Sequence, residues 1–444
     1  MTRFLSSAIA ASAMVASVLA LPDSAAAQQF IRDAEIEHYV RGWVTPIFVA
    51  AKLDPYSVEI NLIQSDQINA FVANGQRVFL YTGVLQAAHD PLEILGVVAH
   101  ETGHIEGGHL ARTQQALKDA NRQAILAFLL SVAAASAAGN GAAVGPAILG
   151  GQDMVGRAFL AYTRQQEQAA DQAGVTLLIA AGYSPRGLLS FMETMAQDPL
   201  QITGPDPYLQ THPLFPERVQ ALRQRVQGAA TLNTPVSARI KAEFSRLQAK
   251  LEGFLDPVPK VLAHYPASDT SVGARYARAV AYHRSGMLVQ SLSEVDALLG
   301  LSPDDPYYLE LKGQVLLENG RVADAIAPYA RAVKVAPDEP LIRVGLASAL
   351  IATDDPALMR DAVTQLTTSF NLDNRNSEAW RLLAVAYGRT GDLGQSALAS
   401  SEQALLEGSK EEAQRFADLA SRRLSKGSPG YLRAQDIINF VKKK

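Results

Sequence analysis

Apolar positions in the first half of the chain recur with two different spacings. Between residues 34 and 53 they return every three or four positions, which predicts an amphipathic helix. Three shorter stretches, 57–63, 70–73 and 77–82, are rich in β-branched and aromatic residues and predict strands. Asn74-Gly75 separates the last two strands and is a strong hairpin signal. This half of the chain is therefore expected to combine a small sheet with helices.

The second half carries a longer periodicity, which begins near Val272. Small residues and prolines return there after 34 residues, in the pairs Ala279 and Gly313, Gly286 and Gly320, and Pro303 and Pro337. This is the period of tetratricopeptide helix pairs, in which small residues stand where two helices cross. A third unit starts at Pro340, a fourth surrounds Trp380, and residues 409–424 are expected to cap the stack. The fold class predicted for the whole chain is an α+β domain followed by an all-α solenoid.

The composition mainly excludes certain kinds of ligand and covalent chemistry. The 444 residues suffice for two or three domains, 19% of them are charged, and a formal net charge of −4 leaves no basic excess for nucleic acid. Cysteine is absent, which excludes disulfides and lipid attachment through a thiol. The concave surface of the repeats is expected to bind proteins or peptides, and a purely structural spacer is the alternative.

Two apolar segments raise the question of membranes. Residues 1–27 have the pattern of a secretory signal peptide, with Arg3 before an apolar run and small residues at the cleavage site. An uncleaved anchor is the alternative reading. The segment 124–138 is too short to span a bilayer comfortably, so we expect it to cover the site or pack on the core. Peripheral contact with a membrane surface is the less favoured alternative.

The strongest chemical signal is the run His100-Glu101-Thr102-Gly103-His104. On a helix the two histidines share one face, so both imidazoles can reach one metal ion with Glu101 beside it. Neutral imidazoles bind Zn²⁺ while leaving a water site open, and a carboxylate can accept the proton as water attacks a carbonyl. Because so short a pattern also arises by chance, the solvated side of an amphipathic helix remains the alternative.

His109 does not stand at the position of a third ligand. One class of zinc peptidases takes its third ligand from H-E-x-x-H-x-x-G-x-x-H, and Gly107 fits that pattern, but Leu110 occupies the position that requires histidine. If the helix continues, His109 faces away from His100. We therefore expect a structural or supporting role for His109.

Further candidates lie downstream. Glu167 and Asp171 are four residues apart and share a helix face, where Glu167 could complete a metal site and Asp171 could orient a ligating histidine. As an isolated pair, two such carboxylates more often form a solvated face. His212 lies between Thr211 and Pro213, where a turn or helix-cap role is the ordinary reading.

Taken in order, the motifs at 100–104, 167–171 and 211–213, together with Arg218, resemble the HtpX-type zinc metallopeptidases, a family of glutamate-ligand zincins. The resemblance covers roughly residues 33–230 and is far more specific than H-E-x-x-H alone. It implies three ligands for one Zn²⁺ per chain and one general base. The ligands would be His100, His104 and Glu167, and the base Glu101.

The resemblance also implies roles around the metal. Asp171 would support a ligand from the second shell, and His212 and Arg218 would lie close to the ion. Arg218 or a neighbour is expected to stabilise the oxyanion. In one branch of the family, the histidine that matches His212 can occupy the open zinc position and hold the enzyme latent.

That branch is soluble and periplasmic, carries helical repeats, and is linked to assembly and quality control of outer-membrane proteins. The domain order expected here is a signal peptide (1–27), a metallopeptidase domain (28–230), a helical linker (231–270) and repeats (271–444). We expect a periplasmic zinc endopeptidase that acts on misfolded or stalled outer-membrane proteins and docks to the barrel assembly machinery through its repeats. The alternative is a chaperone or scaffold whose proteolysis is minor or latent.

Overall fold

The computed structural model of the protein describes residues 30–73, 75–109, 111–112, 164–197, 212 and 216–442. The expected signal peptide and the apolar segment 124–138 lie outside the described residues. Within the described part, no helix is both long and apolar enough to cross a membrane.

A four-stranded sheet forms the centre of the N-terminal half, with strand order β1-β2-β4-β3. Its members are β1 (Phe30–Ile31), β2 (Glu59–Ile63), β3 (Ala70–Ala73) and β4 (Arg77–Tyr81). The predicted hairpin forms between β3 and β4, which are antiparallel, and Gly75 at its turn has a φ of 95° that favours glycine. β2 and β4 pair in parallel, and β3 is left as an edge strand.

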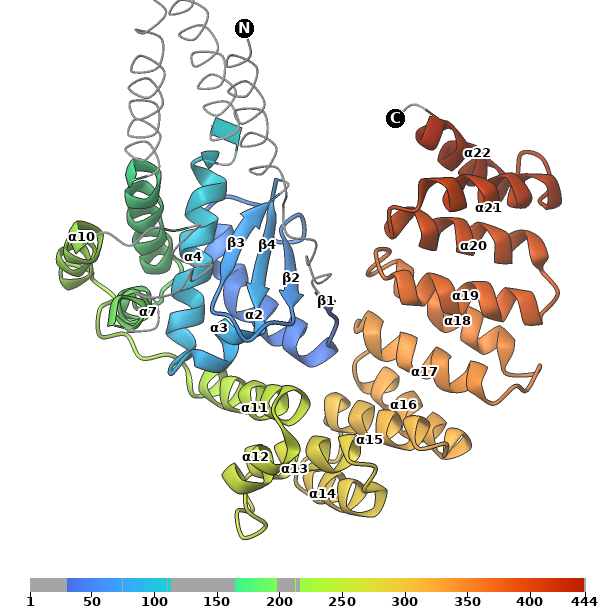
Figure 1. Ribbon diagram of the computed structural model, residues 1–444, viewed down its shortest axis with the longest axis horizontal. Coiled ribbons are helices and arrows are strands. Elements are labelled where there is room, and N and C mark those ends of the chain that lie inside the picture. The colour runs from blue at the N-terminus through green and yellow to red at the C-terminus, as the bar shows by residue number, and fades with distance from the viewer. Residues whose placement is uncertain are drawn as a thin grey trace, which may run out of the picture.

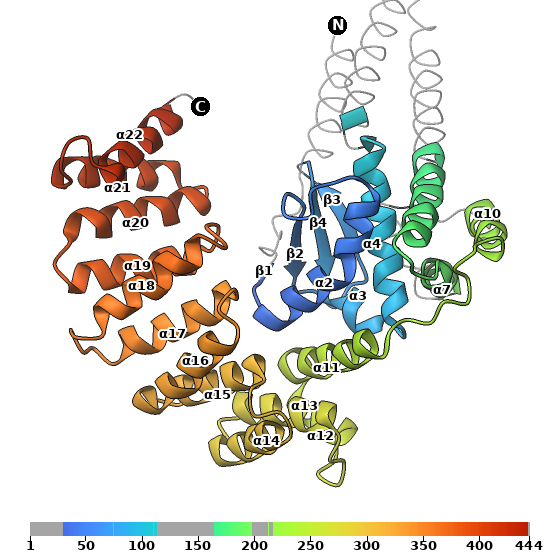
Figure 2. The same ribbon diagram turned by 180° about the vertical axis from the view of Figure 1, so that it is seen from behind.

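The sheet shares one hydrophobic core with the helices of this half. These helices are α2 (Ala34–Ala50), α3 (Thr82–Ala87), α4 (Pro91–Glu106), a helix over residues 164–180, α7 (Arg186–Gln197) and α10 (Pro216–Gln227). α4 lies beside the edge strand β3, between the sheet and the outer helices (Figures 1 and 2). α4 and α7 are in close contact at Gly96, which has no side chain. A Cβ at this position would lie only 2.5 Å from the backbone nitrogen of Leu188. The predicted α+β class is thus confirmed.

The C-terminal half is a succession of helix pairs stacked in chain order, which rises from the bottom of Figure 2 to its upper left. Two helices lead into it, α11 (Ala238–Leu255) and α12 (Val258–His264). The stack comprises α13 (Val272–Arg284), α14 (Leu288–Leu301), α15 (Pro306–Glu318), α16 (Val322–Val335), α17 (Pro340–Ala352), α18 (Met359–Phe370), α19 (Ser377–Arg389), α20 (Leu393–Leu406), α21 (Lys410–Arg423) and α22 (Pro429–Lys442). The predicted repeats are confirmed.

The repeating glycines mark the turn within each pair. Gly286, Gly320 and Gly391 have φ values of 69°, 77° and 81°, a left-handed conformation that only glycine adopts without strain. In the third pair Asp354 takes this conformation instead, with a φ of 61°. The stack also extends past the expected cap at 409–424, because α22 adds a further helix.

Buried charges join the two halves. α11 contributes Lys250, whose Nζ lies 2.7 Å from Asp33 Oδ2 and 3.1 Å from Glu35 Oε2 near the start of α2. From the same helix, Arg246 forms an ion pair of 2.5 Å with Asp305, the residue that caps α15. Ion pairs buried with good geometry specify orientation. The solenoid is therefore held against the sheet domain at a defined angle.

Candidate metal centre

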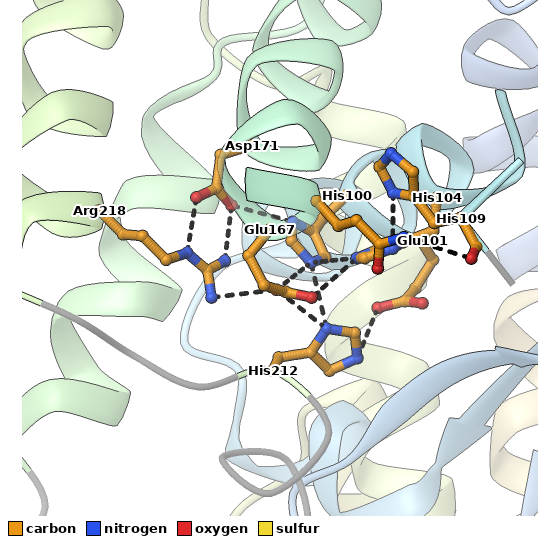
Figure 3. A network of polar contacts seen from close by, with 9 residues as sticks. His100, Glu101, His104, His109, Glu167, Asp171, His212 and Arg218 are labelled. Atoms are coloured by element: carbon orange, nitrogen blue, oxygen red, sulfur yellow. Dashed lines mark hydrogen bonds and ion pairs between the residues drawn. The ribbon is translucent and has the colours of Figure 1, made fainter. Parts of the chain in front are cut away.

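α4 presents two imidazoles side by side. Asp90 caps the start of the helix by accepting a hydrogen bond from Leu92 N, and the residues around the motif are almost wholly buried. His100 and His104 lie one turn apart, and their Nε2 atoms are 3.1 Å from each other. Figure 3 shows both rings directed at the same point. Both Nε2 atoms are thus directed at one point inside the protein, where further polar side chains meet them.

Helix 164–180 brings Glu167 to this point. One carboxylate oxygen lies 3.4 Å from His100 Nε2 and the other lies 3.3 Å from His104 Nε2. The two helices can approach this closely because Gly103 has no side chain: a Cβ there would lie 2.9 Å from the carbonyl oxygen of Ala170. The carboxylate is 2% exposed, so its charge requires partners within the protein.

His212 completes the cluster from a third segment. Its Nδ1 lies 3.3 Å from His100 Nε2 and 3.2 Å from Glu167 Oε2. One ligand atom from each of His100, His104, Glu167 and His212 lies within 4.8 Å of the other three. The other nitrogen of His212, Nε2, lies 3.4 Å from Glu101 Oε1.

Glu101 stands beside this cluster. Both of its carboxylate oxygens are buried, and among the described residues neither accepts a hydrogen bond. A buried carboxylate without hydrogen bonds is costly in a protein interior, and such groups usually have a functional explanation. Its oxygens are therefore available to a water molecule or substrate that enters the site.

Asp171 and Arg218 lie behind the cluster, as Figure 3 shows. Asp171 Oδ1 lies 3.0 Å from His100 Nδ1. Arg218 donates to both oxygens of Asp171, from Nε and Nη2, each at 2.8 Å, and its Nη1 lies 3.0 Å from Glu167 Oε2. The guanidinium is 1% exposed. These contacts differ from the expectation that Arg218 stabilises an oxyanion, because its N–H groups are directed at the two carboxylates.

The charges of the cluster favour a cation at its centre. Burial acts to raise the pKa of Asp171, but hydrogen bonds from His100 and Arg218 hold it below the ordinary value. The pKa of Glu167 is likewise lowered, by its contacts with the three histidines against the effect of burial. Burial acts to lower the pKa of His100, and the two carboxylates raise it to about 10. The donor set, two to three imidazoles and a carboxylate, therefore fits a divalent transition metal.

His109 takes a position that sequence reasoning missed. α4 ends at Glu106, and Gly108 has a φ of 59°, so the helix is interrupted there; helical backbone resumes at His109, and Arg112 N donates to the Gly108 carbonyl oxygen at 3.1 Å. The ring of His109 returns to His104, with the two Nδ1 atoms 3.0 Å apart. The pair Gly107-Gly108 could have signalled this ending, since glycine is common just past the last helical turn. Leu110 lies outside the described residues.

Two imidazoles on one helix, a glutamate from a second helix and a neighbouring buried carboxylate form an arrangement that could hold a metal ion, as the zincin type of metallopeptidase does. Residues 31–226 match the family model described as "Peptidase family M48", and residues 276–340 and 310–358 match "Tetratricopeptide repeat". The protein is therefore a metalloendopeptidase with an M48 peptidase domain followed by tetratricopeptide repeats.

Several known proteins are similar to this chain over part or most of its length. The chain is 26% identical over 387 residues to the Beta-barrel assembly-enhancing protease of Yersinia pestis, which covers 83% of this chain and 75% of the relative. The protein of the same name from Escherichia coli (strain K12) is 26% identical over 376 residues, again 83% and 75%. Metalloprotease LoiP of Escherichia coli (strain K12) is 29% identical over 173 residues, 38% of this chain and 64% of LoiP.

Proposed function

We propose that the protein is a zinc-dependent endopeptidase in which His100, His104 and Glu167 hold one Zn²⁺ per chain. The observation that supports this most is the convergence of donor atoms from separate segments: α4, helix 164–180 and His212 bring four of them within 4.8 Å of one another. Tetrahedral nitrogen and oxygen ligation is what zinc prefers. A catalytic zinc site needs three protein ligands and one exchangeable position. His100, His104 and Glu167 supply the three ligands, and His212 lies at the fourth position.

In this proposal Glu101 is the general base. When bound, zinc polarises the scissile carbonyl and makes water a better nucleophile at neutral pH. Glu101 takes a proton from the attacking water on a carboxylate oxygen and passes it to the leaving amide nitrogen. Its buried oxygens accept no hydrogen bond among the described residues, and Oε1 faces His212 Nε2 at 3.4 Å, so the base becomes accessible to water when that ring moves away. β3, beside α4, is an edge strand among the described residues, and an extended peptide could pair with its outer side.

Asp171 and Arg218 act by positioning. Asp171 Oδ1, 3.0 Å from His100 Nδ1, favours the tautomer that carries its proton on Nδ1, which leaves the Nε2 lone pair directed at the metal. Arg218 binds Asp171 in a bidentate fashion and also contacts Glu167, so a single guanidinium orients both carboxylates. This support replaces the oxyanion role expected for Arg218 from the sequence.

Metal analysis tests the zinc assignment. Purified wild-type protein is expected to contain about one zinc per chain, the stoichiometry of a mononuclear site. Removing the metal with a chelator should abolish cleavage of unfolded casein, and adding back Zn²⁺ should restore it. A chain that binds no zinc, or that retains full activity after the metal is removed, would contradict the assignment.

His212 is the proposed latch. Its Nδ1 lies beside the three ligands and its Nε2 faces Glu101, so the ring occupies the space where water and substrate would bind. His212→Ala should therefore raise casein cleavage, by roughly 10-fold if the latch is closed nine-tenths of the time. The matched control is His89→Ala, an exposed histidine just before α4. Unchanged or lower activity in a folded, zinc-loaded His212→Ala protein would exclude the latch.

The cellular role follows from the relatives and the predicted signal peptide. We propose that the protein works in the periplasm, in assembly and quality control of outer-membrane β-barrel proteins, and that misfolded or stalled barrels are its substrates. The repeats α13 to α22 would recruit these substrates or the barrel assembly machinery. A second candidate function is a scaffold with latent proteolysis, which the position of His212 in the metal centre favours.

A further inference from the structure

The end of α4 carries a contact that the catalytic assignment does not use. A histidine that binds a metal usually donates its other ring N–H to an acceptor, which fixes the tautomer and the orientation of the ring. His100 has Asp171 for this purpose, at 3.0 Å from its Nδ1. For His104 the corresponding neighbour is His109, whose Nδ1 lies 3.0 Å from His104 Nδ1.

Hydrogen-bonding chemistry determines which ring donates. Two neutral imidazoles can share one hydrogen bond only if one nitrogen carries the proton and the other offers its lone pair. His104 directs Nε2 at Glu167 and His100, so its lone pair belongs on Nε2 and its proton on Nδ1. His109 must then accept at Nδ1 and carry its own proton on Nε2. The tautomers of both rings are thereby specified.

The backbone is shaped to bring this acceptor back to the helix. Gly108, at a φ of 59°, interrupts the helix directly after α4 and so changes the direction in which the next side chain points. At Gly107 a Cβ would lie 2.3 Å from His109 Nε2, so only glycine leaves room for the returning ring. His109 is 5% exposed and meets His104 edge to face, with ring centroids 4.9 Å apart. Gln166, next to Glu167, donates to the His109 carbonyl oxygen at 3.4 Å, which links the turn to the second metal-bearing helix.

We propose that His109 is a positioning residue for His104. It accepts a hydrogen bond from the Nδ1–H group of His104 and so keeps the Nε2 lone pair of His104 directed at the metal. The inference depends on the proposed ligand set. The two ligating histidines are then supported differently, His100 by an anionic acceptor and His104 by a neutral one. A neutral acceptor polarises the ligand less than a carboxylate does, so losing it should weaken zinc binding toward the lower end of the ~10- to 100-fold range typical of such partners.

Zinc affinity of the full-length protein, measured by competition with a chromogenic chelator, tests the proposal. His109→Phe keeps a buried ring of similar size without an acceptor and should weaken zinc binding by about 10-fold or more. His109→Asn should recover most of the affinity, because the side-chain oxygen can stand near the position of Nδ1 and accept. His89→Phe, the same exchange at the exposed histidine before α4, should leave the affinity unchanged.

Gly107→Ala provides a second approach that keeps the imidazole. Its backbone is helical, so alanine fits the chain, but the added methyl group must displace the His109 ring. It should weaken zinc binding as His109→Phe does, while thermal unfolding of the metal-free protein changes little. If His109→Phe does not fold, the zinc affinity of Gly107→Ala tests the proposal in its place.

The outcomes distinguish a wrong ligand assignment from a wrong role for His109. A wild-type chain that binds no zinc would overturn the ligand assignment and this proposal with it. Wild-type zinc affinity in both His109→Phe and Gly107→Ala would overturn the proposal alone. Equal losses in His109→Phe and His109→Asn would also overturn it, because packing and not hydrogen-bond acceptance would then be the role of His109.

Discussion

Replacing Glu101 by glutamine should abolish peptide-bond hydrolysis while leaving zinc bound. Glutamine has nearly the same shape as glutamate but cannot take a proton from water, and loss of a general base typically costs ~10²- to 10⁴-fold in rate. Glu101 is not among the four converging ligand atoms, so metal content should stay at the wild-type level. The measurement is the turnover of unfolded casein, together with zinc analysis of the same preparation.

Glu106→Gln serves as the matched control, because it makes the same exchange at an exposed glutamate on the same helix. It should leave the turnover unchanged. The Glu101→Gln protein also distinguishes protease from scaffold in cells that depend on it for barrel assembly. Full rescue of assembly by this variant would favour the scaffold, whereas failure of a folded, zinc-bound variant would show that proteolysis is the required activity.

Removing the charge of Arg218 should produce the largest loss of stability. Its guanidinium, 1% exposed, contacts the buried carboxylates of Asp171 and Glu167. Arg218→Met preserves much of the volume but leaves two buried negative charges without their cation, which typically costs ~3 to 5 kcal/mol in the free energy of unfolding. Urea unfolding of the metal-free protein measures this difference. Zinc binding should weaken as well, because both carboxylates lose their orientation.

Arg225→Met is the control for that experiment, since Arg225 is exposed on the same helix α10. It should change the free energy of unfolding by less than about 0.5 kcal/mol, as surface substitutions usually do. The pKa of Asp171 is held below its usual value of 3.8 by His100 and Arg218, against the effect of burial. The stability difference between Arg218→Met and wild type should therefore persist above that pH and narrow as the pH falls below it. Equal stabilities at pH 7 would exclude a supporting role for Arg218.

Local features of the chain were predictable where their signal lies within a few residues. The strand predicted at 70–73 coincides with β3, because its pattern and the adjoining Gly75 turn are both local. The repeats were predictable because the first two pairs reproduce the same small residues and prolines at a spacing of 34 residues. β1 was not predicted, since two residues carry no periodicity. α22 was missed as well, although its buried residues Ala434, Ile437 and Ile438 have helical spacing.

The metal centre was only partly predictable. His100 and His104 share a helix face whatever the rest of the chain does. We expected a structural or supporting role for His109, but the direction of its ring depended on whether the helix continues past Glu106, which the sequence left open. The contacts of Arg218 could not be derived from residue spacing, because its partners lie on a different helix and compete for the same guanidinium.

By itself, the sequence determined the helical pair of imidazoles with its adjacent glutamate, the strand and repeat pattern, and the absence of thiol chemistry, since each of these follows from residue type and local period. Only the tertiary structure decided that Glu167 and His212 meet those imidazoles, that Arg218 supports the carboxylates, and that His109 turns back onto His104. The physical reason is that these contacts depend on close packing between distant segments, such as Gly103 against Ala170, and, for His109, on the direction that its side chain takes after the helix is interrupted at Gly108.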